Sequence, residues 1–293
     1  MRGTGRFEIH EASITFNKWN HPVSFVFFGD VHKFAPNHAD DVWKEFLEKH
    51  KNRPDTYFFG MGDYLDLMSA SERASWRKGE WHESTEETLE KFYVKRVAEF
   101  CEDIKFMRGR LIGMLEGNHF LRFPDGTTTA MRMCQDLGAR YLGDCAVVRT
   151  HFRSSSKNNI SLKMDMVLHS GIGGGRTTGA SFNSLDQMAN AFEGASIYAM
   201  GDNHQRGGVP TQRLYLSDNH HGEGKIKDRQ ILLLRTGAFL KGFVPGKASY
   251  VVDAMMRPSN LGAIRVDVTP RRRRYGPHGR DGDESWFDLE VIA

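Results

Sequence analysis

Short apolar runs alternate with amphipathic segments in the first half of the chain. The runs with the length and composition of buried strands are residues 23–28, 57–59 and 111–115. Between the first two runs, Val42, Phe46 and Leu47 recur at the spacing of one helix face. A longer amphipathic helix is predicted from Ser84, whose hydroxyl can cap its first turn. Because strands and helices alternate, this half predicts an α/β fold.

The second half carries more predicted strands and fewer helices. Its strand-like runs are residues 146–152, 160–168, 213–216, 231–234 and 262–268. One helix is predicted over residues 184–192, before the apolar segment 197–200. We therefore expect a second sheet packed on the first, with helices on the outside.

The segment 271–293 is polar and rich in glycine. It opens with the run Arg271–Arg274 and continues with several acidic residues. We predict one domain over residues 1–270 and a peripheral tail over 271–293, docked by Trp286 and Phe287. The arginine run could grip a phosphate backbone, but its acidic neighbours favour a solvated tail.

Composition narrows the class of protein only slightly. The 293 residues are 39% hydrophobic and 26% charged, which is ordinary for a globular domain. Forty Lys and Arg against 37 Asp and Glu give a net charge of +3, which does not by itself indicate a nucleic-acid binder. Three cysteines without metal-type spacing fit a reducing compartment. With neither a secretory signal nor a membrane-crossing run, a cytoplasmic protein is expected.

Polar motifs follow the apolar runs in a fixed order. They are Asp30-Val31-His32, Gly62-Asp63, Gly117-Asn118-His119, the single His169, and Gly201-Asp202-Asn203-His204. Alternate residues of an extended chain point to one side, so Asp30 and His32 can reach one ion. Asp63 offers two oxygens and can bridge two ions. Taken singly, each residue is better explained as a turn former, a helix cap or an ordinary histidine; together they favour metal ligation.

The ligand types indicate the kind of metal site. Mixed imidazole and oxygen ligands suit Mn, Fe, Zn or Co better than Ca. Two ions about 3.5–4 Å apart can hold a bridging hydroxide and also grip a phosphoryl oxygen. We therefore expect two divalent ions, with Mn favoured and Fe, Zn, Co or Mg as alternatives.

With these motifs the chain resembles the calcineurin-like metallophosphoesterase superfamily, over roughly residues 23–268. The resemblance implies a four-layer αββα sandwich with two central mixed sheets flanked by helices. It implies that one metal takes Asp30, His32, Asp63 and His204, and the other takes Asp63, Asn118, His169 and Asp202. His119 would not ligate; it would protonate or stabilise the leaving oxygen.

Two positions depart from the family pattern. Asp202 stands where the family has a histidine; it can still ligate, and it adds a negative charge that favours harder ions. Alternatively, the second metal lacks a ligand there. Phe120 replaces the acidic residue often found after the third motif, so His119 is either oriented by something else or oriented less tightly.

Candidate substrate-binding residues lie near the motifs. Arg122 could clamp phosphate through its planar guanidinium, or form a surface ion pair instead. Arg176 ends a glycine-rich loop after His169, which could admit substrate or simply be flexible. The segment 67–82 combines basic residues with Trp76 and Trp81, a mixture that can hold a nucleic-acid strand. Packing of this segment as a long loop on the core is the favoured alternative.

The sequence thus predicts an enzyme, a dinuclear-metal phosphoesterase in which a bridging hydroxide attacks phosphorus. A phosphodiester, either a nucleotide or a nucleic acid, is the favoured substrate. A phosphomonoesterase is the nearest alternative. A catalytically degenerate member that binds nucleic acid or a protein is the alternative from another class, and Asp202 is the feature in its favour. The sequence does not indicate the oligomeric state.

Overall fold

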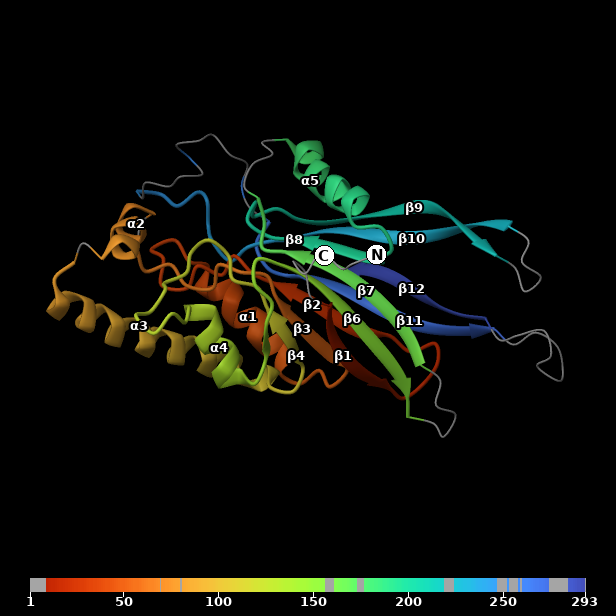
Figure 1. Cartoon of the computed structure of the whole chain (residues 1–293), viewed down its shortest axis with the longest axis horizontal. Helices are drawn as coiled ribbons and strands as arrows, with labels where there is room; N and C mark the ends of the chain where they lie inside the picture. Colours follow the sequence, from red (N-terminus) through yellow and green to blue (C-terminus); the bar gives the residue numbers. More distant parts are fainter. Residues whose placement is uncertain are drawn as a thin grey trace.

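A computed structural model gives the fold of the chain. It describes residues 9–68, 70–79, 81–155, 161–172, 177–218, 224–246, 252, 258, 260–273 and 284–292. Two six-stranded mixed sheets lie face to face in the described part (Figure 1).

The first sheet has the strand order β12-β11-β2-β3-β4-β5. Its strands are β2 (Val23–Phe28), β3 (Thr56–Gly60), β4 (Leu111–Met114), β5 (Arg140–Tyr141), β11 (Ile264–Arg273) and β12 (Glu284–Ile292). The strands β2 to β5 are parallel, so their carboxyl ends meet at one edge. The strands β11 and β12 run antiparallel to their neighbours.

The second sheet has the order β1-β6-β7-β8-β10-β9. Its strands are β1 (Ile9–Phe16), β6 (Cys145–Ser154), β7 (Ser161–His169), β8 (Ile197–Met200), β9 (Arg206–Asp218) and β10 (Gly224–Thr236). β7 and β8 are parallel neighbours, so His169 and Met200 end side by side.

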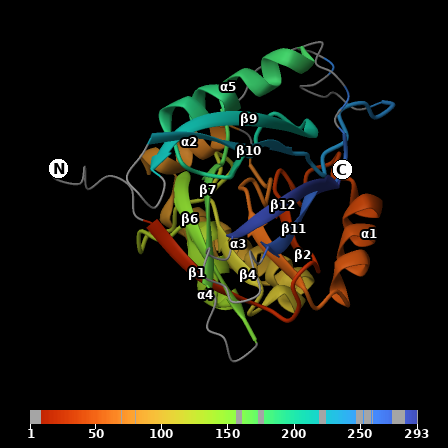
Figure 2. The same ribbon diagram turned by 90° about the vertical axis from the view of Figure 1, so that its right-hand side faces the viewer.

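Helices cover the outer face of each sheet. α1 (Asp40–Lys51), α3 (Glu83–Ile104) and α4 (Thr129–Leu137) pack on the first sheet, whereas α5 (Thr178–Ala191) packs on the second. The two views place α5 and the other helices on opposite sides of the paired sheets (Figures 1 and 2). A short helix α2 (Ala70–Lys78) and a 3-10 turn, η1 (Lys105–Met107), complete the elements. The predicted α/β class with four layers is therefore confirmed.

The central core lies between the sheets and explains why the apolar runs form strands. Phe25, Phe27 and Val266 of the first sheet meet Val148 and Leu232 of the second, all almost fully buried. Burial of such side chains stabilises the fold by roughly 1.5–3 kcal/mol each.

Several predicted boundaries need correction. Residues 284–292 are not a peripheral tail: they form the edge strand β12, paired with β11 over its whole length. The predicted boundary at 270 falls within β11. Phe287 does dock, with its ring centroid 4.6 Å from that of Phe152. Arg274 lies outside the described residues.

The predicted helices are present, but their starting residues and one capping residue differ from the prediction. α3 begins at Glu83, and the Nδ1 atom of His82, not the hydroxyl of Ser84, accepts the capping hydrogen bond. α5 starts six residues before the predicted 184. The segment 67–82 contains α2 and is not one long loop. None of the helices in the described residues is long and apolar enough to cross a bilayer.

Candidate metal centre

The polar motifs meet in loops at the carboxyl ends of strands from both sheets. Backbone hydrogen bonds tie the first two loops together: Asp30 N donates to Gly62 O, and His32 N donates to Asp63 O, each at 3.0 Å. Five predicted ligands have backbone φ angles in the left-handed region, which side chains other than glycine rarely adopt: Asp30 (47°), His32 (46°), Asp63 (53°), Asp202 (67°) and His204 (55°). Such strain costs on the order of 1–3 kcal/mol per residue and gathers at functional sites.

Two glycines permit the close approach of these loops. At Gly117, with φ of 81°, an added Cβ would lie 2.3 Å from Oδ1 of Asp63. At Gly171, with φ of 132°, it would lie 2.2 Å from Cβ of Asp202. Both positions therefore require glycine.

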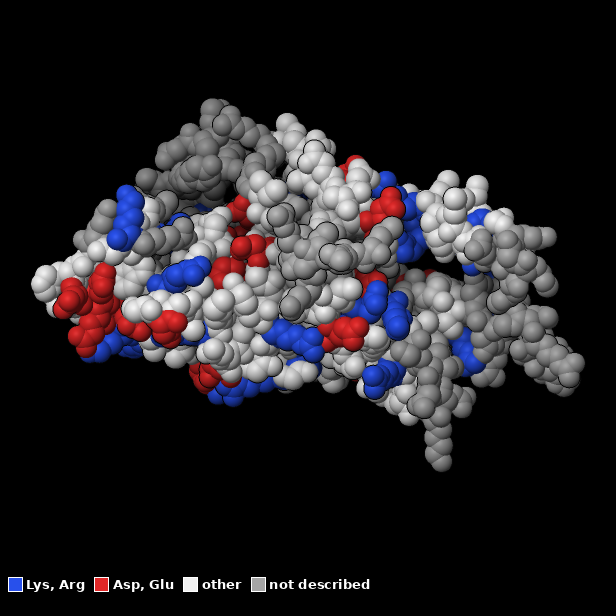
Figure 3. All heavy atoms as spheres, in the orientation of Figure 1, with Lys and Arg blue, Asp and Glu red and all other residues white. Residues whose placement is uncertain are grey.

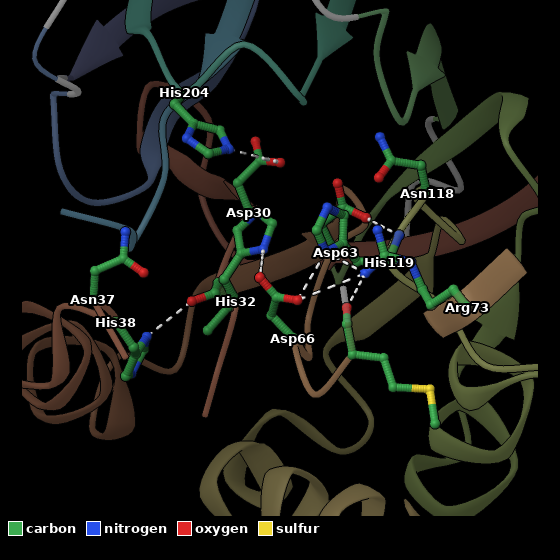
Figure 4. A network of polar contacts seen from close by, with 12 residues as sticks. Asp30, His32, Asn37, His38, Asp63, Asp66, Arg73, Asn118, His119 and His204 are labelled. Carbon is green, nitrogen blue, oxygen red and sulfur yellow. Dashed lines mark hydrogen bonds and ion pairs between the residues drawn. The ribbon is translucent and has the colours of Figure 1, made fainter. Parts of the chain in front are cut away.

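Asp30, His32 and His204 form one cluster of ligand atoms. Their donor atoms lie within 4.8 Å of one another, and Figure 4 shows the three side chains converging. Asp30 and His32 are 1% and 3% exposed, yet Oδ1 of Asp30 and Nε2 of His32 have no hydrogen-bond partner. Buried polar atoms without partners are costly, so a cation at this point would fit the donor set.

A second group of predicted ligands lines a cavity of about 270 Å³: Asp63, Asn118, His169 and Asp202. Nδ2 of Asn118 donates to Oδ1 of Asp202 at 3.1 Å, which leaves the Asn118 carbonyl oxygen available. Nδ1 of His169 accepts a hydrogen bond from Gly171 N at 2.9 Å. Ligation through that nitrogen would require this hydrogen bond to be given up.

Asp63 joins the two groups. It lines the cavity of the second group, and its carboxylate also lies within 4.8 Å of donor atoms on His32 and His119. Its Oδ1 accepts a hydrogen bond from His119 N at 2.8 Å. This is the position required of a carboxylate shared by two ions.

His119 is oriented by Asp66, which the motif analysis missed. Oδ1 of Asp66 lies 3.1 Å from Nδ1 of His119, and Nη1 of Arg73 lies 3.2 Å from the same nitrogen (Figure 4). Burial alone would raise the pKa of Asp66, but hydrogen bonds from His119 and His32 lower it well below its ordinary value. An ionised Asp66 accepts from Nδ1–H of His119, which leaves Nε2 facing away from Asp66. Because a protonated Nδ1 cannot also accept, the guanidinium of Arg73 pairs with Asp66 instead, with Nη1 3.7 Å from Oδ1.

Charges inside the centre are compensated by a buried arginine. Burial, and then the charges of Asp63 and Asp202, raise the pKa of Asp30 well above its ordinary value. Arg235 is 1% exposed, and its Nη1 donates to Gly201 O at 3.1 Å. Burial lowers its pKa to about 10, against the opposing effect of Asp202 and Asp30. Arg235 thus remains charged at neutral pH.

Two of the predicted histidine ligands, His204 and His169, are in the neutral form that metal binding requires. Burial lowers the pKa of His204 to about 3, assisted by His32 and His119. Burial also lowers the pKa of His169. Both imidazoles are therefore neutral at pH 7, as ligation requires.

Three further residues escaped the sequence analysis. Asp66 follows Asp63 by three positions, a spacing that could have indicated it. Asp144 lines the cavity beside His169 but belongs to no motif. Arg235 lies within an apolar strand, where only its charge marks it.

The substrate-binding predictions remain untested. Arg122 is exposed, and its carbonyl accepts a hydrogen bond from Nε1 of Trp76 at 2.8 Å. No contact described for Arg122 places its guanidinium in the cavity, and Arg176 lies outside the described residues. Trp76 is buried with Tyr93, Leu121 and Phe123, so the core-packing alternative holds for this tryptophan.

The surface adds no support for nucleic acid as a partner. Figure 3 shows Lys and Arg interspersed with Asp and Glu across the described part of one face. Mixed signs do not make the basic stripe that follows a phosphate backbone. This partner therefore stays a prediction.

Comparisons with known proteins give a weak structural likeness. No protein-family model and no curated protein sequence match the chain. The chain is similar to the crystal structure of wild-type Vps29 complexed with Zn²⁺ from Entamoeba histolytica, with 9% identity and a TM-score of 0.38, covering 92% of this chain and 98% of that one. It is also similar to Vps29 of Chaetomium thermophilum, with 8% identity and a TM-score of 0.35, covering 92% and 96%. We take no functional conclusion from similarity at this level.

Proposed function

We propose that the protein is a dinuclear-metal phosphoester hydrolase of the calcineurin-like metallophosphoesterase type. One observation carries the proposal: two groups of ligand side chains converge on a shared carboxylate, Asp63. Asp30, His32 and His204 would hold one ion with it. The other ion would take Asn118, His169 and Asp202, which line one cavity together with Asp63.

The chain's own residues supply orientation and proton transfer. Two divalent ions, when bound, would supply Lewis acidity and an activated water. His119 stands beside the shared carboxylate and would give a proton to the departing oxygen through Nε2. Asp66 would accept from Nδ1–H and stabilise the doubly protonated ring, which can then give up the proton on Nε2. A phosphodiester is the favoured substrate, as the sequence predicts, and a phosphomonoester is the nearest alternative.

A binding protein without turnover is the second candidate. Hydrogen bonds within the protein already engage part of the second group, from Asn118 to Asp202 and from Gly171 to His169. If these bonds persist, only the ion at Asp30, His32 and His204 would bind.

The test is hydrolysis of a chromogenic phosphodiester and a chromogenic monoester with Mn²⁺ added, then with a chelator. Turnover that the chelator abolishes, and that is lost in Asp63→Ala and His119→Ala, would support the enzyme. His21→Ala, at an exposed histidine, is the matched control and should retain activity. Metal-loaded wild-type protein inert on both esters and on DNA and RNA would favour the binding protein.

A further inference from the structure

The ribbon formed by β9 and β10 carries the three most exposed large apolar side chains of the described residues. Leu216 is 85% exposed, Leu214 75% and Ile226 65%. Leu216 lies directly opposite Ile226 in the register of the two strands, and Leu214 precedes Leu216 by two residues, so all three share one face. Leu232 and Leu234 continue this face into the core between the sheets. Exposed apolar clusters of this kind mark interaction sites on soluble proteins.

β9 is also an edge strand, because it is the last strand of its sheet and pairs with β10 alone among the described strands (Figure 1). Its first residues are protected from further pairing. Pro210 has no N–H to donate, and Gly208 lies so close to β12 that an added Cβ would be 2.8 Å from Cγ1 of Val291. Residues 211–218 of the strand include neither proline nor glycine. Such an exposed edge offers backbone N–H and C=O groups to a strand of another chain.

The opposite face of the ribbon is positively charged. Lys227 lies opposite Tyr215 on this face, and both are exposed. The two acidic residues of β9 and β10, Asp218 and Asp228, lie on the apolar face instead. The ribbon therefore separates its cations from its carboxylates. The cations of the charged face are Arg213, Lys225, Lys227 and Arg229.

Only part of this charge is compensated within the protein. Nη2 of Arg213 lies 3.0 Å from Oδ1 of Asp186 on α5. Lys225 and Lys227 are exposed and form no ion pair within the described part of the chain. A strand added beside β9 would therefore meet uncompensated positive charge on one face and apolar side chains on the other.

We propose that the edge of β9 over residues 211–218 binds an extended acidic segment of a partner protein, which joins the sheet as a further strand. Alternate side chains of such a segment point to opposite faces. Its apolar residues would cover Leu214 and Leu216, and its acidic residues would face the cations of the charged face. Backbone hydrogen bonds to β9 would supply affinity, and the alternation would supply selectivity. The inference does not rest on the proposed function, because no residue of this edge belongs to the candidate metal centre.

Charge favours this occupant over a second copy of the chain. Two β9 edges paired with each other would form one continuous sheet, with the charged faces of both copies on the same side. Arg213 and Lys227 of one copy would then lie near those of the other, and like charges across paired strands are destabilising. A nucleic acid would use the cations but leave Leu214 and Leu216 in contact with water.

A designed peptide tests the edge directly. It alternates glutamate and valine, carries a fluorophore and is long enough to span residues 211–218. Fluorescence anisotropy should show saturable binding to the full chain. Two control peptides should bind at least roughly tenfold more weakly: one alternates lysine and valine, and the other is the glutamate peptide with its central backbone amides N-methylated. Absence of saturable binding, or equal binding of the N-methylated peptide, would overturn the proposal.

Variants of the ribbon locate the binding. Leu216→Glu places a carboxylate on the apolar face and Lys227→Glu reverses a charge on the other, so each should weaken binding of the glutamate peptide roughly tenfold. Val94→Glu and Lys95→Glu, at exposed residues of α3, are the matched controls and should bind as the wild type does. An equal loss in the controls would show that net charge alone governs binding, and would contradict the proposal.

Two further measurements distinguish the other occupants. Hydrogen exchange of the β9 amides over residues 211–218 should slow in the peptide complex, and an unchanged rate would exclude strand addition. A single-stranded oligonucleotide that displaces the peptide and binds Leu216→Glu undiminished would assign the edge to nucleic acid and overturn the proposal. Dimerisation in sedimentation experiments that is lost in Leu216→Glu would assign the edge to a second copy and overturn it equally.

Discussion

The two halves of the candidate metal centre are built differently. In the first-sheet half, the ligands that follow β2 and β3 (Asp30, His32 and Asp63) are at most 3% exposed, and backbone hydrogen bonds hold their loops together; Asn118, after β4, is exposed. The second-sheet half, His169, Asp202 and His204, is partly exposed, and it reaches the first chiefly through side chains. Asp202 N, for example, donates to Oδ2 of Asp30 at 2.9 Å. The comparison indicates a preformed first half and a second half that depends on its neighbours.

Asp63→Asn should have the largest effect because it removes the carboxylate of the first half that both ions would share. The amide keeps the shape and can still accept from His119 N, but it lacks the charge needed between two cations. We expect phosphoesterase activity to fall by roughly a thousandfold and both ions to be lost in elemental analysis. A variant that retained two ions would show that the halves bind metal independently.

Asp66→Asn should weaken only the first half. The amide can still contact Nδ1 of His119 but no longer stabilises the doubly protonated ring that donates from Nε2. We expect kcat to fall roughly a hundredfold for an ester with a poor leaving group, less for a nitrophenyl ester, with metal content unchanged. An equal loss for both esters would indicate damage to the site instead of lost proton transfer.

A buried histidine outside the candidate metal centre gives a test of folding stability alone. His50, on α1, is 5% exposed between Phe46 and Phe58, and burial lowers its pKa to about 4. In the unfolded chain, the imidazole of His50 takes up a proton near pH 6.5. The stability it contributes is therefore fully present above about pH 6.5 and is lost as the pH falls towards 4.

The free energy of unfolding should fall by about 2 kcal/mol through protonation of His50 in the unfolded chain. Urea unfolding with chelator present, from pH 7.5 to 4.5, should show a shallower pH dependence in His50→Phe than in wild type. Exposed His21→Ala serves as the comparison and should follow the wild-type curve. Identical curves for wild type and His50→Phe would mean that the pKa of His50 is not lowered by folding.

Asp202 gives the smallest and most specific test of the second half. If it ligates, Asp202→His should keep two ions and shift preference from Mn²⁺ towards Zn²⁺, by roughly tenfold in relative affinity. Asp202→Ala should lose the second ion first. Unchanged metal content and kinetics in Asp202→Ala would remove this residue from the ligand set.

Most of the fold and of the candidate site could be predicted from one pattern, in which an apolar run is followed directly by a polar motif. Such a pattern predicts a buried strand and places the polar side chains at its carboxyl end. Because the carboxyl ends of neighbouring parallel strands lie together, residues as far apart in sequence as Asp30 and His204 come close in the fold. β12 was missed because its alternating polar and apolar residues suit an edge strand with one face exposed. The roles of Asp66 and Arg235 could not be predicted because they depend on partners distant in sequence, His119 and Gly201.

Arg235 also fixes the balance of charge at the centre. Five carboxylates, on Asp30, Asp63, Asp66, Asp144 and Asp202, and two guanidinium groups, on Arg73 and Arg235, leave three negative charges around the centre. Two divalent ions would convert this excess to one positive charge in a partly buried recess. Such a recess would draw anions from a distance, so association rates should decline as ionic strength rises. Without Arg235, the loaded centre would carry one positive charge less, and capture of a phosphate dianion would be slower.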